Sequence, residues 1–98
     1  MPRGFMIAHI TVTNPERWAE YAKASGPIMS NWGAKLIVRP DSLEVVEGTS
    51  RPRVVIFSFE SLQKARDFWN SPEYADLKKL RDGAGDADFL LMEEAVGD

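Results

Sequence analysis

The stretch Phe5-Met6-Ile7-Ala8-His9-Ile10 decides the fold, because it is apolar at almost every position. Side chains alternate between the two faces of a β-strand, so a sheet with one face in water shows alternating apolar and polar residues. This stretch does not alternate, and the segments 36–38, 54–59 and 89–92 do not alternate either. The four segments therefore predict strands that bury both of their faces.

A helix is predicted directly after the first strand. Asn14 followed by Pro15 is typical of a helix start, because asparagine caps the first turn and proline fits the first helical position. The side chains that follow at helical spacing are Trp18, Tyr21, Ala22 and Ser25. Gly26-Pro27 predicts a break or kink, after which the helix continues for a turn or two and ends at Gly33.

The rest of the chain supplies more strands and a second helical region. Further strands are predicted over 34–39, 53–59 and 87–94, with a short extra strand over 43–47. Ser61 is expected to cap the second helix, and Ser71-Pro72 to start a new helical segment after it.

The order strand-helix-strand-strand-helix-strand corresponds to two split β-α-β units, the ferredoxin-like pattern of the α+β class. The sequence predicts one domain over residues 1–98, with a four-stranded antiparallel sheet and its helices on one face. Because the strands are apolar on both faces, the helix-free face needs a cover from outside the chain. A second copy is the simplest cover, so we expect a homodimer that forms a dimeric α/β barrel.

Composition narrows the classes of function. The chain has a formal net charge of −3, which argues against nucleic acid and anionic membranes as partners. It has no cysteine and a single histidine, so thiol catalysis and a metal site are not expected. No phosphate-binding glycine loop is present, and the sequence predicts no cofactor. No segment resembles a signal peptide or a membrane span, so the expected location is cytoplasmic.

Several motifs are similar to those of one known family. They are Thr13-Asn14-Pro15-Glu16 with Tyr21, Gly26-Pro27, the segment 33–39, Glu47-Gly48, Arg51-Pro52-Arg53-Val54-Val55, and Trp69-Asn70-Ser71-Pro72-Glu73-Tyr74 with Leu77 and Arg81. Over nearly its whole length the chain resembles the domain of unknown function 1330 family, in the ferredoxin-like dimeric α/β-barrel superfamily.

The resemblance implies two monomers whose sheets face each other and close a barrel around a central cavity. This agrees with the argument from the strands. The resemblance implies no particular activity, because relatives in the wider superfamily include cofactor-free monooxygenases, haem-degrading enzymes, muconolactone isomerases and stress-responsive proteins.

His9 is the first candidate catalytic residue. By parity it shares a strand face with Phe5 and Ile7, where an imidazole could act as a general base or bind an anion. A half-buried histidine with one hydrogen bond is the alternative. Glu93 or Glu94 could face His9 as an acid–base partner, or could lie in solvent at the strand end.

Three aromatic residues on the predicted helices are candidates as well. Tyr21 is a candidate catalytic residue, because a phenol near a cavity can donate a hydrogen bond to a substrate oxygen. Trp69 and Tyr74 are candidate ligand-binding residues. Aromatic side chains at helical spacing also serve simply as core, so both roles stay open for all three.

Charged residues between the second and third strands are candidates for anion binding. Arg39 and Arg53 flank this region, and Arg51 lies close by. Guanidinium groups at the mouth of a cavity suit a carboxylate or another anion. Arg39, Arg53 and Glu47 are therefore candidate ligand-binding residues. The arginines could instead form structural salt bridges, with Glu44 or Glu47 as partners.

Three functions are compatible with the sequence, and whether the protein is an enzyme stays open. We favour a dimeric barrel that binds a small, partly apolar, anionic molecule without turnover. The alternatives are a cofactor-independent monooxygenase or isomerase acting on an aromatic or lactone-like compound, and a structural dimer without ligand. Cavity volume separates them, because a ligand has no room if the barrel is filled by Phe5, Ile7, Phe57, Phe59 and Phe89.

Overall fold

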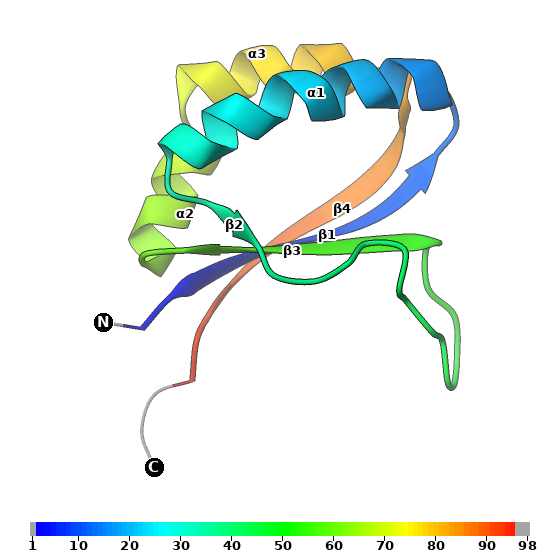
Figure 1. Ribbon diagram of the computed structural model, residues 1–98, viewed down its shortest axis with the longest axis horizontal. Helices are drawn as coiled ribbons and strands as arrows, with labels where there is room; N and C mark the ends of the chain where they lie inside the picture. The colour runs from blue at the N-terminus through cyan, green and yellow to red at the C-terminus, as the bar shows by residue number, and fades with distance from the viewer. Residues whose placement is uncertain (1, 96–98) are drawn as a thin grey trace.

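The computed structural model describes residues 2–95, and its elements follow the predicted order (Figure 1). The strands are β1 (Gly4–Val12), β2 (Lys35–Leu36), β3 (Arg53–Phe59) and β4 (Gly85–Glu93), and the helices are α1 (Pro15–Asn31), α2 (Leu62–Trp69) and α3 (Pro72–Arg81). The strands form one antiparallel sheet in the order β2-β3-β1-β4. All three helices lie on one side of it, which confirms the ferredoxin-like α+β prediction.

Polar side chains cap the helices where the sequence predicted. Asn14 accepts a hydrogen bond from the backbone N–H three residues ahead at the start of α1, and Ser61 and Ser71 do the same for α2 and α3. Pro15 and Pro72 occupy the first turn, where the missing N–H would have no partner within the helix.

Helix α1 passes through Gly26-Pro27 as one helix, so the predicted break does not occur there. Pro27 removes a single N–H···O bond, and the carbonyl that loses it belongs to Lys23, an exposed residue. Gly26 has no Cβ to collide with the proline ring, which removes the usual obstacle to helical geometry before proline. The chain leaves the helix at Gly33 as predicted, with a φ of 77° that suits glycine.

The region between α1 and β3 contains less strand than predicted. β2 comprises Lys35–Leu36 instead of 34–39. The short strand predicted over 43–47 is absent, and residues 37–52 form an irregular segment. Pro40 has no backbone N–H to donate, which disfavours strand pairing beyond residue 39.

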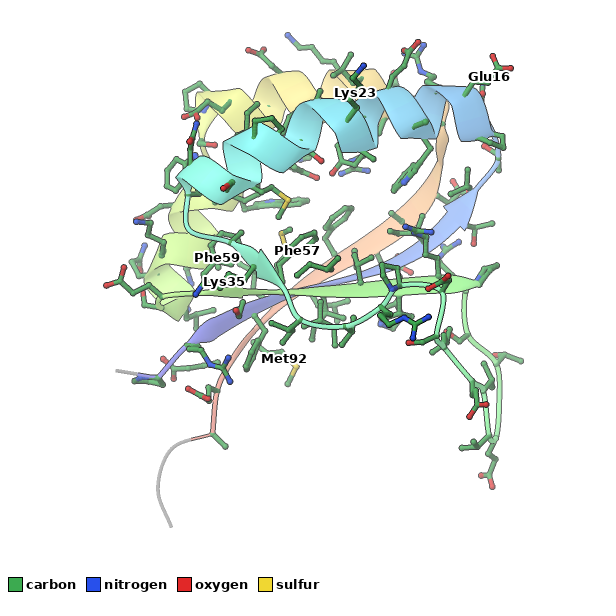
Figure 2. The ribbon with its side chains drawn as sticks, viewed as in Figure 1. Glu16, Lys23, Lys35, Phe57, Phe59 and Met92 are labelled. Carbon is green, nitrogen blue, oxygen red and sulfur yellow. The ribbon has the colours of Figure 1, made fainter. Side chains whose placement is uncertain are left out.

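The sheet is apolar on both faces, as the four strands predicted. We call the face that packs against the helices the covered face; it carries Met6, Ala8, Ile10, Val55, Phe57, Phe59, Phe89 and Leu91. We call the opposite side the free face; it carries Phe5, Ile7, His9, Val54, Ile56, Leu90 and Met92. Figure 2 shows Phe57 and Phe59 on the helix side of the sheet and Met92 on the other side.

This arrangement corrects one expectation about the interior. Phe5 and Ile7 lie on the free face, whereas Phe57, Phe59 and Phe89 lie on the covered face, so these five side chains fill no common space. Cross-strand partners share a face, and the register places Phe57 opposite an even-numbered residue of β1. The side of the sheet on which each of these side chains lies is set by the pairing register, and the sequence of a single strand does not contain that register.

Candidate functional site

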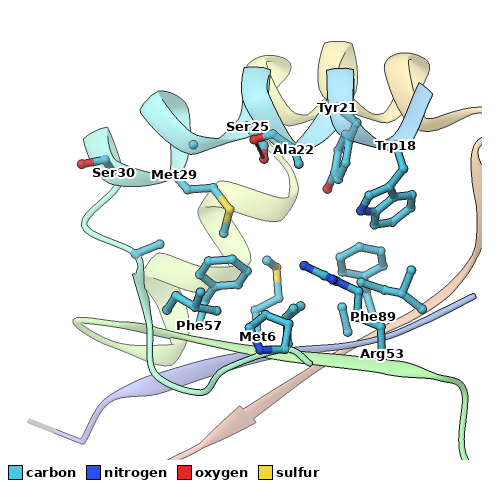
Figure 3. A pocket seen from close by; sticks show the side chains of 17 residues that line it. Met6, Trp18, Tyr21, Ala22, Ser25, Met29, Ser30, Arg53, Phe57 and Phe89 are labelled. Atoms are coloured by element: carbon cyan, nitrogen blue, oxygen red, sulfur yellow. Dashed lines mark hydrogen bonds between the residues drawn. The ribbon is translucent and has the colours of Figure 1, made fainter. Parts of the chain in front are cut away.

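A pocket of about 240 Å³ lies between α1 and the covered face (Figure 3). Its walls are mostly apolar, with Trp18 and Met29 above and Met6, Val55 and Phe57 below. A cavity of about 150 Å³ is enough to hold benzene. The pocket therefore has room for a substituted aromatic ring or an aliphatic molecule of similar size.

The pocket exists because small side chains face each other across it. Ala22 and Ser25 lie on the sheet side of α1, and Ala8 lies in the middle of β1 below them. The larger Trp18 and Met29 flank these positions on α1 and are buried against the sheet. The small residues Ala22 and Ser25, which interrupt the large apolar side chains of α1, were the sequence signal for this cavity. The cavity was not predicted from them.

The pocket opens at the edge of the sheet near β2. Its exposed lining residues are Ser30 and Leu36 near β2 and Arg53 at the start of β3, whereas Met6 and Ala8 in its floor are buried. A molecule that enters would pass Arg53 at the mouth and come to rest among buried apolar side chains.

Two of the predicted site residues, Tyr21 and Arg53, supply polar groups to this pocket. Tyr21 points down into it from α1, and Arg53 extends into it from the start of β3 (Figure 3). No salt bridge to Arg53 forms within residues 2–95. An unpaired guanidinium and a phenol in a mostly apolar pocket can bind an oxygen-bearing ligand at defined points.

The Tyr21 hydroxyl forms a hydrogen bond with the hydroxyl of Tyr74 on α3, with an O···O distance of 2.9 Å. Burial raises the pKa of the Tyr21 phenol, because the charged phenolate would lose its hydration, and the neighbouring Tyr74 raises this pKa further. Arg81 acts in the opposite direction, because its positive charge favours the phenolate. The net result is a phenol that stays protonated.

Arg81 has a place near the site that sequence reasoning did not assign. Its guanidinium carbon lies 4.5 Å from the ring centroid of Phe89, and 5.8 Å and 6.0 Å from those of Tyr21 and Tyr74. Its Nε is buried and has no hydrogen-bond partner among the described residues. The available signal was spacing, because Arg81 follows Tyr74 by seven residues and so lies on the same side of α3.

His9 lies on the free face, on the opposite side of the sheet from the pocket. Its cross-strand neighbours are Val54 on β3 and Asp88 on β4. Glu93 and Glu94 lie beside the start of β1, about 16–20 Å along the strand from His9 at the usual rise per residue. The structure therefore brings neither glutamate next to the histidine.

The other predicted residues lie outside the pocket. Arg39 and Glu47 are exposed on the irregular segment that follows β2. Trp69 and Tyr74 pack together with a ring separation of 4.8 Å, and both pack on Phe89, at 5.1 Å and 6.3 Å. Phe89 lines the pocket, so Trp69 and Tyr74 contact the pocket lining from outside and hold Phe89 in place.

The salt bridges also differ from those expected. Arg51 pairs with Asp88 at 3.0 Å, and not with Glu44 or Glu47. Arg51 and Asp88 lie beside the free face, where they form a polar border next to His9.

Two further observations concern residues 2–95 only. This range holds no group of three or more histidine, aspartate or glutamate side chains arranged to bind a metal ion. None of the helices in the described part of the chain is long and apolar enough to cross a membrane.

Comparison with known families settles the relationship suggested by the motifs. Residues 3–95 match the family model described as Domain of unknown function (DUF1330). The chain belongs to this family. None of the curated proteins compared with this DUF1330 chain matches it.

Solved structures share the fold of this DUF1330 protein at low sequence identity. The RPA0582 protein of unknown function from Rhodopseudomonas palustris is 18% identical, with a TM-score of 0.74 over 98% of this chain and 85% of the other. SnoaB, a cofactor-independent oxygenase from Streptomyces nogalater, is 12% identical, with a TM-score of 0.62 over 99% and 97%. A dimeric ferredoxin-like protein of unknown function from Thermobifida fusca is 10% identical, with a TM-score of 0.58 over 94% and 91%.

Proposed function

We propose that this DUF1330 protein binds a small, mostly apolar, anionic molecule in the pocket beneath α1. The observation that carries the proposal is an apolar cavity of about 240 Å³ with Arg53 at its mouth. Within the described residues no carboxylate neutralises this arginine by a salt bridge. A carboxylate on the ligand would supply the missing partner, and the ring or alkyl part would occupy the apolar interior.

The energetics suit such a ligand. Each apolar group that leaves water for the pocket contributes about 25 cal/mol per Å² of buried surface. A charge-assisted hydrogen bond from Arg53 to a carboxylate contributes roughly 1.5–3 kcal/mol. The apolar walls provide most of the affinity, and Arg53 selects the anion.

The first experiment compares 4-isopropylbenzoate with its neutral amide by calorimetry. We expect the benzoate to bind more tightly to the wild-type protein, and Arg53→Gln to weaken it by about tenfold or more. Arg39→Gln is the matched control, because it removes an exposed arginine outside the pocket. Equal losses in the two variants, or no preference for the anion, would contradict the proposal.

A pocket-filling variant provides a second test. Ser25 lines the pocket from the middle of α1 and is buried, so Ser25→Leu places a larger side chain in the cavity. We expect this variant to stay folded and to lose binding of the benzoate. Retained affinity in a folded Ser25→Leu protein would show that the ligand binds elsewhere.

We also propose that two copies associate through their free faces. A row of aliphatic side chains crosses β3, β1 and β4 there, namely Ile56, Ile7 and Leu90. Ile37, just after β2, extends the row, because its N–H donates to the carbonyl of Ile56. Burial of such a row is favourable, and the Thermobifida fusca protein of similar fold is described as dimeric. Sedimentation of the wild-type protein at micromolar concentration should give the mass of two chains. A single-chain mass would rule the dimer out.

The second candidate function is a cofactor-independent monooxygenase or isomerase. It is favoured by the Tyr21 hydroxyl inside the pocket and by the likeness in fold to SnoaB. Oxygen uptake with a phenolic aromatic substrate that disappears in Tyr21→Phe would support it. Binding of the substrate without oxygen uptake or product would support a binding protein without turnover. In either case we propose a cytoplasmic location. A purely structural dimer is the least favoured alternative, because the pocket is not filled.

A further inference from the structure

The hydroxyls of Tyr21 and Tyr74 form a pair whose two ends have different surroundings. Tyr74 is completely buried, and its hydroxyl lies 2.9 Å from that of Tyr21. Within residues 2–95 Tyr21 is the sole hydrogen-bond partner of the Tyr74 hydroxyl. Tyr21 lines the pocket, so its own hydroxyl can also meet a molecule inside it.

Either hydroxyl could donate at this distance, but the asymmetry favours Tyr74 as the donor. Each neutral phenol has one proton, and each oxygen can also accept. If Tyr21 donated to Tyr74, the Tyr74 proton would be buried without an acceptor, at the full cost of desolvation. If Tyr74 donates to Tyr21, the Tyr74 proton is paired and the Tyr21 proton is left for the pocket. The second arrangement leaves no buried donor unpaired.

Arg81 also favours donation by Tyr21 into the pocket. Its guanidinium stacks on Phe89 and lies within about 6 Å of both tyrosine rings. No salt bridge involving Arg81 forms in the part of the chain that the structure describes. An uncompensated positive charge near the Tyr21 oxygen makes the Tyr21 O–H a stronger donor, since it stabilises the negative charge that builds on the oxygen.

We infer that Tyr21 donates a hydrogen bond into the pocket, and that the buried end of the ligand therefore carries an acceptor oxygen, such as that of a ketone. Tyr21 is the specificity-determining residue, and Tyr74 and Arg81 are positioning residues that act through it. The inference rests on the proposed ligand pocket. Combined with the anion at Arg53, it points to a small keto acid with an apolar, ring-sized body.

The direction of donation can be tested without any ligand. The chain contains two tyrosines, so a protein labelled with ¹³C at tyrosine Cζ gives two NMR signals, which Tyr74→Phe assigns. In an equal mixture of H₂O and D₂O, a slowly exchanging hydroxyl splits the Cζ signal, whereas a fast one gives a single averaged line. We expect a split signal for Tyr74 and a single line for Tyr21. A split signal for Tyr21 would overturn the inference.

The acceptor preference is tested with 4-acetylbenzoate and 4-isopropenylbenzoate, which have nearly the same shape and differ in the carbonyl oxygen. We expect the wild-type protein to bind the ketone about tenfold more tightly, because its oxygen pairs with Tyr21. Tyr21→Phe should bring the two affinities within about twofold of each other. An unchanged ratio in Tyr21→Phe would contradict the assignment.

The positioning residues are tested by the same ratio. Tyr74→Phe and Arg81→Met should lower the preference for the ketone while 4-isopropenylbenzoate binds as before, and Arg81→Lys should restore part of it. A purely structural role would weaken both probes equally. If neither probe binds the wild-type protein, the proposed function fails together with the ketone preference, and the NMR measurement still decides the direction of donation.

Discussion

Met6 and Met92 are the same kind of residue on neighbouring strands, yet Met6 is 1% exposed and Met92 is 56% exposed. The difference comes from the side of the sheet on which each lies. Met6 points to the covered face, where the helices pack, and Met92 points to the free face. Within one chain, therefore, one apolar face of the sheet is buried by the helices and the other is largely exposed.

The two faces also differ in the polar groups they hold. On the covered face α1 leaves a pocket that contains Tyr21 and Arg53. On the free face the aliphatic row is bordered by His9 and by the ion pair of Arg51 and Asp88. Under the proposed function, the covered face binds a small molecule and the free face binds a second copy of the chain.

The largest expected effect tests this comparison with matched methionines. Met6→Ala removes a fully buried side chain, so it should lower the free energy of unfolding by about 2–5 kcal/mol. Met92→Ala removes an exposed one, so at a protein concentration low enough to keep the chain monomeric it should cost less than about 1 kcal/mol. Urea denaturation of both variants measures this. Similar losses under those conditions would mean that the two faces are not distinct.

A pair of leucines tests the free face as an interface. Leu90 on the free face and Leu80 on α3 are 44% and 37% exposed in the single chain. Leu90→Lys should weaken the dimer by about a hundredfold, because it buries a charge among the aliphatic side chains of the partner. Leu80→Lys should leave the sedimentation unchanged. Equal effects of the two changes would place the interface elsewhere.

Much of the fold was predictable because its signals are local. The non-alternating strands predicted a sheet that is apolar on both faces, and Asn14, Ser61 and Ser71 predicted the helix starts through their capping side chains. A break or kink was predicted at Gly26-Pro27, with the helix continuing beyond it, and the structure has one helix through this site. The continuity of the helix depends on the glycine before the proline and on the exposure of Lys23, the residue whose carbonyl loses its partner. This exposure is a property of the folded helix.

The site was less predictable because it depends on register and on spacing between layers. Tyr21 and Arg53 were candidates from residue type, and both line the pocket. His9 was a candidate on the same grounds, yet parity places it on the face away from the pocket. The pocket itself arises from small residues on α1 opposite Ala8, and no single segment encodes how far apart the two layers stand.

A buried phenol makes the covered face sensitive to high pH. Burial, and then Tyr74, raises the pKa of Tyr21 above its ordinary value, so the unfolded chain releases this proton at lower pH than the folded chain. The contribution to stability is complete below about pH 10 and falls as pH rises, by up to roughly 1.4 kcal/mol per pH unit. Tyr21→Phe should lack this part of the alkaline loss, and denaturation at a series of pH values measures it. An identical slope in both proteins would contradict the buried phenol.

The smallest expected effect lies at the corner of the free face and has the opposite sign in pH. Glu94 accepts from the backbone N–H of Arg3 at 2.9 Å and from its guanidinium at 3.0 Å, and these bonds lower the pKa of the carboxyl. The stabilisation is therefore present above the ordinary value of 4.5 and is lost as pH falls through the lower folded-state value. Glu94→Gln should lower the melting temperature slightly at neutral pH, and the difference from wild type should vanish in strong acid. Glu93→Gln is the control, because it removes the same charge one residue away without touching the Arg3 contact. A difference that persists in strong acid would assign the effect of Glu94→Gln to packing, because the carboxylate that accepts from Arg3 is absent from both proteins there.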